Sequence, residues 1–118
     1  MITVTQNQLY LNKCTFSNIL CNGDGDDSSL ITFNSYENIN TIRLENSKID
    51  NCKSNGDLIK ISGKLSIIEF INVNINNIIS YGSILYNNAL NVSKKYIYIY
   101  QIKYNDNNNN NKYIIIFF

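Results

Sequence analysis

The sequence lacks several residue types on which common enzyme and binding chemistries depend. Its 118 residues include no histidine, no proline and no tryptophan. Histidine is the usual acid/base catalyst near neutral pH and the commonest metal ligand, so its absence removes both roles. Basic and acidic residues nearly cancel, ten Lys and Arg against nine Asp and Glu. No basic patch is visible, and we therefore expect no nucleic-acid partner.

The sequence also has no long apolar segment, and its first residues do not predict a leader. No run approaches the ~20 apolar residues needed to span a bilayer, so no transmembrane segment is expected. Residues 1–12, MITVTQNQLYLN, lack the basic and apolar regions of a signal peptide. Taken literally, these features predict a cytoplasmic chain. An extracellular or cell-surface location is predicted instead if the chain is part of a longer secreted protein.

Three segments of the chain repeat one pattern of apolar, amide and glycine residues. Each opens with an alternating apolar pair, then reaches an asparagine, and ends on a glycine five residues after it. The segments are LYLNKCTFSNILCNG (9–23), IRLENSKIDNCKSNG (42–56) and IEFINVNINNIISYG (68–82). We interpret Gly23, Gly56 and Gly82 as turn glycines that precede the next apolar run. Repeats of this kind indicate units that bury their apolar sides by stacking.

The spacing within the repeat favours strands. Five extra residues follow the first glycine, and removing them leaves a period of roughly 26 to 28 residues. Alternating apolar positions and abundant Ile and Tyr are typical of strands, not of an amphipathic helix. We predict an all-β fold with three short parallel strands per coil and layers about 4.8 Å apart. The predicted repeat domain covers 1–104, with copies near 9–33, 42–61 and 68–87 and a degraded copy at 96–106. An Asn-rich low-complexity and apolar tail follows at 105–118.

The repeats resemble those of right-handed parallel β-helix proteins with the pectin-lyase-like fold. They are most similar to the degenerate F-x-x-N … G-G-A-I repeats of polymorphic outer-membrane and surface adhesin-like proteins. The residues that carry the resemblance are TFSNI (15–19), KIDNC (48–52), NINNI (74–78) and YGSI (81–84). It covers about residues 9 to 104, with single glycines where that family often has pairs. It implies a right-handed solenoid of about three to four coils. Since no polar cap is visible at either end, we expect a fragment of a longer repeat protein, with further coils of that chain as neighbours.

Stacked coils place equivalent residues in columns, and three columns are predicted to form the core. They are Leu11/Leu44/Phe70, Phe16/Ile49/Ile75 and Ile31/Ile59/Leu85. Cys52 shares a column with Ile19 and Ile78, so we expect a buried thiol. Cys14 and Cys21 fall in other columns, and a disulfide between them stays an open alternative. No C-x-x-C motif points to a metal.

The asparagines of the repeat form a column of their own, Asn18/Asn51/Asn77. Stacked amides can bond to each other and to the turning backbone, and Asn tolerates the left-handed conformation of a sharp corner. We predict a structural ladder, with a ligand-binding ladder as the alternative.

The insertion CNGDGDDSS (21–29) is the feature closest to a metal site. Asn22, Asp24, Asp26 and Ser28 offer oxygens at alternate positions, as in a calcium loop. The closing glutamate is missing, because Phe33 occupies its position. We therefore interpret the insertion as a surface turn and predict no cofactor, leaving calcium as the alternative.

No catalytic constellation is found, and the predicted function is non-catalytic. We expect a repeat module of a secreted or cell-surface protein that presents a β-helix face to a protein or glycan. We interpret the outward face with Thr15/Ser17, Lys48/Asp50 and Asn74/Asn76 as an ordinary solvated surface, with a polysaccharide-binding face as the alternative. The alternatives are a polysaccharide lyase or hydrolase fragment, or a nonfunctional truncated remnant. The resemblance makes Arg43, Lys48, Asp50 and Glu69 the enzyme candidates. However, Asp50 and Glu69 should lie on different strands, and Arg43 and Glu69 are expected to form an ion pair between neighbouring coils.

Overall fold

The structure, a computed structural model, describes residues 1–24 and 28–100. Within these residues every regular element is a β-strand, which confirms the all-β prediction. The last six residues of the predicted degraded copy and the whole 105–118 tail lie outside the described part. The strands are β1 (Ile2–Thr5), β2 (Leu9–Asn12), β3 (Thr15–Ser17), β4 (Leu20–Cys21), β5 (Ile31–Asn34), β6 (Ile39–Glu45), β7 (Lys48–Asp50), β8 (Lys53–Ser54), β9 (Ile59–Asn76), β10 (Ile79–Ser80) and β11 (Leu85–Tyr100).

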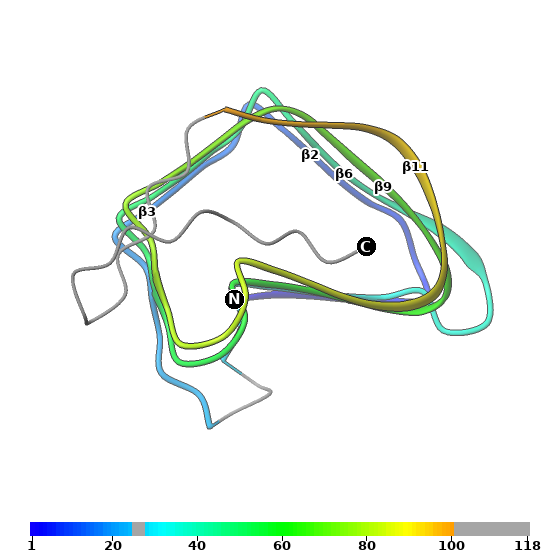
Figure 1. Cartoon of the computed structure of the whole chain (residues 1–118), viewed down its shortest axis with the longest axis horizontal. Helices are drawn as coiled ribbons and strands as arrows, with labels where there is room; N and C mark the ends of the chain where they lie inside the picture. Colours follow the sequence, from blue (N-terminus) through cyan, green and yellow to red (C-terminus); the bar gives the residue numbers. More distant parts are fainter. Residues whose placement is uncertain (25–27, 101–118) are drawn as a thin grey trace.

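Parallel pairing joins strands that are far apart in the sequence. The larger sheet has eight strands and the smaller has three, in the order β10-β8-β4. β9 is the centre of the larger sheet, because it pairs in turn with β5, β6 and β7 on one side and with β11 on the other. Every pair recorded in the described part of the chain is parallel. In Figure 1 the chain follows a nearly closed outline, and β2, β6, β9 and β11 run side by side along one part of it.

The pairing register brings equivalent repeat positions together. Leu9 pairs with Ile42, and Ile42 pairs with Ile68. The first of these steps spans 33 residues and the second 26. Five of the seven additional residues belong to the 21–29 insertion, as the sequence predicts. The other two lie between β5 and β6, around Tyr36, and the sequence analysis missed them.

Two further features differ from the expected pattern of separate short strands. β9 runs without a break through SGKLS (62–66), where the sequence suggested a junction between two strands. Continuous pairing with β11 explains this, since Ala89 and Asn91 pair with Gly63 and Leu65. In addition, β1 pairs with β5 over four residues, so the stack begins before the first repeat copy at Leu9.

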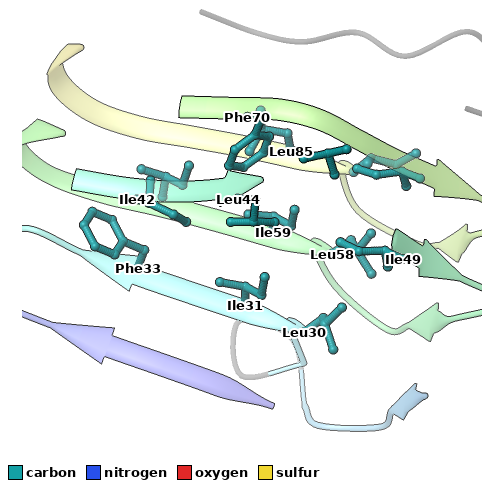
Figure 2. Packing of buried hydrophobic residues seen from close by; sticks show 14 of the residues in the cluster. Leu30, Ile31, Phe33, Ile42, Leu44, Ile49, Leu58, Ile59, Phe70 and Leu85 are labelled. Atoms are coloured by element: carbon teal, nitrogen blue, oxygen red, sulfur yellow. The ribbon is translucent and has the colours of Figure 1, made fainter. Parts of the chain in front are cut away.

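The core lies inside the outline and is built from alternate residues of each strand. Figure 2 shows Phe33, Ile42, Leu44, Ile59 and Phe70 projecting into this interior. All five are completely buried. Full burial stabilises a side chain of this size by roughly 1.5–3 kcal/mol, so these columns are the main source of stability.

The first layer of the stack is less buried than the layers that follow it. β1, β2, β3 and β4 each pair on one side only. The inward-facing side chains of β1, β2 and β3, and of Ile19 just before β4, are half-buried, whereas the equivalent residues of later layers are buried. These half-buried residues are Ile2, Val4, Leu9, Leu11, Phe16 and Ile19. In the described part of the chain, no helix could serve as a membrane span.

Candidate functional site

A groove lies on the outer side of the sheet where β2, β6 and β9 run next to each other. We call it the outer groove, and its volume is about 630 Å³. It crosses three layers of the stack, so residues distant in sequence meet in it. It is lined by Gln8, Leu9, Tyr10, Thr41, Arg43, Ile67 and Glu69.

The register explains why these side chains converge. Tyr10 pairs with Arg43, and Arg43 pairs with Glu69, so the three occupy one outward column. Thr41 pairs with Ile67 in the neighbouring outward column. Because successive residues of a strand point to opposite faces, both columns project away from the core.

Arg43 is the centre of a charged network in the outer groove. Its Nη1 lies 3.4 Å from Glu69 Oε2 and its Nη2 lies 3.0 Å from Glu45 Oε2. The guanidinium carbon is also 5.3 Å from the centroid of the Tyr10 ring, a cation–π contact. The Tyr10 hydroxyl completes the network by donating a hydrogen bond to Glu45 Oε2 at 2.8 Å. The Nε–H of Arg43 is buried and has no hydrogen-bond partner among the described residues.

The network holds its groups in defined protonation states. The hydrogen bond from Tyr10, with the nearby Arg43 charge, lowers the pKa of Glu45. The same hydrogen bond raises the pKa of Tyr10, since removing its proton would leave two anions in contact. Glu45 is therefore an ionised acceptor and Tyr10 a protonated donor at neutral pH.

The sequence analysis identified only part of this network. The Arg43–Glu69 ion pair is present between neighbouring layers. Tyr10 and Glu45 were missed as partners of Arg43. The alignment of the segments LYL, IRL and IEF could have identified Tyr10 as a neighbour of Arg43. The middle residues of the three segments are Tyr10, Arg43 and Glu69, so they fall in one column. Glu45 follows Arg43 by two residues on the same face of β6, which is also readable from strand alternation.

The other enzyme candidates lie elsewhere. Lys48 and Asp50 belong to β7 and form an ion pair with each other at 3.0 Å. Asp50 Oδ1 also accepts a hydrogen bond from Asn76 at 3.3 Å. Asp50 sits in the ladder of β3, β7 and the end of β9, whereas Glu69 sits in the ladder of β2 and β6. The structure does not bring these two carboxylates together.

The Asn18/Asn51/Asn77 column forms a continuous chain of amide hydrogen bonds. Asn51 Nδ2 donates to Asn18 Oδ1, and Asn77 Nδ2 donates to Asn51 Oδ1. All three residues have positive φ, between 52° and 57°. A second column at another corner was missed by the sequence analysis. There Asn72 Nδ2 donates to Asn46 Oδ1 at 2.8 Å, and both residues again have positive φ.

The described residues of the calcium-loop alternative differ in their exposure to solvent. Asn22 and Asp24 are exposed, whereas Ser28 is buried and its carbonyl accepts a hydrogen bond from Ser54 Oγ at 2.6 Å. Asp26 lies outside the described residues. Across residues 1–24 and 28–100, no group of three or more His, Cys, Asp or Glu side chains could hold a metal ion. Of the turn glycines, Gly82 packs closely against Asp57 and Gly56.

All three cysteines are free thiols. Cys52 is buried, in the column of Ile19 and Ile78. Cys21 is also buried, and burial raises the pKa of its thiol. Cys14 is half-buried, and its Sγ lies 3.5 Å from the carbonyl oxygen of Asn12.

Comparison with protein-family models, curated protein sequences and solved structures finds no match to this chain.

Proposed function

We propose that the chain is a right-handed parallel β-helix module of about three to four coils, and that its outer faces bind a protein or glycan without catalysis. The module would belong to a secreted or cell-surface protein. The observation that carries the proposal is the register, which places Tyr10, Arg43 and Glu69 from three layers in one outward column. A stack with such columns offers a regular surface for a partner.

The repeat geometry supports the β-helix interpretation. Ile2, Ile31, Ile59 and Leu85 form a column of four paired residues. A parallel crossover within one sheet is right-handed in about 98% of cases, which favours the right-handed form. The resemblance of TFSNI and KIDNC to surface adhesin-like repeats supports the location.

The state of the outer groove supports binding over catalysis. Both Glu45 and Glu69 are engaged by Arg43, and a glycosidase of the two-carboxylate type needs one carboxyl group to remain a proton donor. The lowered pKa of Glu45 works against that role.

The test is to incubate the purified chain with pectin, xylan, β-glucan and mannan, and to measure retention and product release separately. We expect retention on at least one polymer with no new reducing ends and no unsaturated uronate products. Release of either product would overturn the non-catalytic function and support the lyase or hydrolase alternative.

A further inference from the structure

We propose that the outer groove is a binding site for a neutral oligosaccharide, with the ring of Tyr10 as its platform. This inference rests on the proposed function and names the ligand class and the face that binds it. Three properties of the groove lead to it: a fixed aromatic ring, polar groups that both donate and accept, and a local charge that disfavours anions.

The Tyr10 ring is exposed yet held in place. Its relative exposure is 57%, large for an aromatic side chain. The hydroxyl is fixed by Glu45, and Arg43 covers the ring at 5.3 Å. A ring held at two points loses little conformational entropy when a ligand packs on it. An aromatic ring with a polar tip suits a ligand with both apolar and polar surface, and the C–H face and hydroxyls of a sugar provide both.

The polar lining of the outer groove matches hydroxyl groups. The Gln8 amide and the Thr41 hydroxyl can each donate and accept, and neither has a recorded hydrogen bond within the described part of the chain. Arg43 donates to Glu45 and Glu69 through two of its five N–H groups. The two carboxylates retain further acceptor lone pairs. A ligand must therefore offer donors and acceptors close together, which vicinal hydroxyls do.

The charges at the groove select against ionic ligands. Arg43 and Glu69 line the groove, and Glu45 forms an ion pair with Arg43. One cation and two anions leave a net charge of minus one. A polyuronate would meet this negative potential, and a polycation lacks acceptors for the N–H groups of Arg43. A neutral polyol avoids both penalties.

The alternative face on the third strand of each coil is less suited to a ligand. Lys48 and Asp50 bond to each other, and Asp50 also accepts from Asn76. The charged groups of this face are therefore paired with each other, and none of its six residues offers an aromatic ring as a platform.

The experiment measures binding of cellohexaose, xylohexaose, mannohexaose and laminarihexaose to the full chain by isothermal titration calorimetry and NMR shift mapping. Hexagalacturonate and hexalysine are the anionic and cationic probes. The variants are Tyr10→Ala, Tyr10→Phe and Thr41→Val. Tyr86→Ala is the matched control, because Tyr86 is 39% exposed and lies on β11 in the ladder of Lys60, away from the outer groove. Far-UV circular dichroism of each variant verifies folding.

We expect saturable binding of at least one neutral hexaose. Tyr10→Ala should weaken it about tenfold, and Tyr10→Phe should weaken it about two- to threefold, because the ring then loses one of its two points of attachment. Tyr86→Ala should change it less than about twofold. Thr41→Val should weaken it without changing the fold. Shifts should concentrate on β2, β6 and the middle of β9.

Three results would overturn the inference: no saturable binding of any neutral hexaose, equal affinity for folded Tyr10→Ala and the parent chain, or tighter binding of hexagalacturonate or hexalysine. Each of these would leave protein binding by the module intact. Release of reducing ends from a bound hexaose would instead overturn the non-catalytic function, so the two failures are distinguishable.

Discussion

Asn77 donates its side-chain N–H to Oδ1 of Asn51 at 3.1 Å, and both residues hold a left-handed backbone, with φ of 54° and 52°. Each asparagine therefore does two things at its corner. It adopts a φ that costs most L-residues roughly 1–2 kcal/mol, and its side chain bonds to the asparagine of a neighbouring layer. The middle residue, Asn51, has an amide partner on each side.

Substituting Asn51 separates these two contributions. Asn51→Gly keeps access to positive φ but loses the side-chain bonds, and should lower the free energy of unfolding by about 1 kcal/mol. Asn51→Ala loses both, and should lower it by about 2–3 kcal/mol. Urea denaturation followed by circular dichroism measures both values. The control is Asn55→Ala, at an exposed asparagine without positive φ. Equal effects of Asn51→Gly and Asn51→Ala would show that the backbone conformation contributes nothing.

Gly63 should tolerate no side chain. Its φ is 115°, and a Cβ at this position would collide with Ser35 Oγ and lie 2.7 Å from the backbone nitrogen of Tyr36. We expect Gly63→Ala to lower the free energy of unfolding by about 3 kcal/mol or more. Ser62→Ala on the preceding residue is the control and should stay within about 0.5 kcal/mol. A thermal melt of Gly63→Ala that matches the parent chain would contradict the close approach at this corner.

The Tyr10–Glu45 hydrogen bond should appear in the pH dependence of stability. The folded-state pKa of Glu45 is lowered, so the stability that this bond contributes is present above the ordinary glutamate pKa and is lost as pH falls through the folded value. Tyr10→Phe removes the donor, and the pKa of Glu45 should rise toward its ordinary value. Carboxyl-carbon NMR titration of Glu45 in both proteins measures the shift. The stability difference between them should be present at pH 7 and disappear in acid.

The pKa prediction has its own control. Glu37 is 81% exposed at the side chain and pairs only with Lys64 among the described residues, so its carboxyl-carbon signal at pH 7 should be the same in Tyr10→Phe and the parent chain. An unchanged Glu45 titration in Tyr10→Phe would show that the hydrogen bond is not formed in solution.

The three thiols should react in a defined order. Cys14 is half-buried, whereas Cys21 and Cys52 are buried, and burial raises the pKa of Cys21. Because the thiolate is the nucleophile, Cys14 should react with Ellman's reagent first in the native protein. All three should react in denaturant. Cys14→Ser should remove the fast phase; a fast phase that persists in this variant would place another thiol at the surface.

Much of the layered architecture was readable from strand alternation and repeat spacing. The positions of Leu44, Ile49 and Phe70 in the repeat predicted that they would be buried, and they are. The insertion after the first repeat was found because its five additional residues separate Gly23 from the next apolar run, whereas the other two copies join these directly. The strand pair β1–β5 was not found, since Ile2–Thr5 is too short to display a repeat of its own.

The outer groove was harder to predict, because its residues are connected by contacts between long side chains. Arg43 contacts Glu69 in its own column, but it contacts Glu45 along the strand and Tyr10 through its ring face. Column alignment places Tyr10 and Glu69 beside Arg43, but it does not reveal Glu45 or the ring-face geometry of the Tyr10 contact. The Asn46–Asn72 bond was missed because the matching position in the first layer is Lys13, which has the same positive φ but no amide.

The sequence by itself determined the all-β class, the faces of the strands and the alignment of the layers, because a period of two residues dictates which side chains point inward. Only the tertiary structure decided that β9 continues through Gly63, that the first layer leaves apolar side chains half-buried, and that Tyr10, Arg43, Glu45 and Glu69 form one network in the outer groove. These depend on how layers more than twenty residues apart in sequence are stacked, and on side-chain contacts such as Arg43–Glu45 at 3.0 Å and Arg43–Tyr10 at 5.3 Å, which form only once the layers are in place.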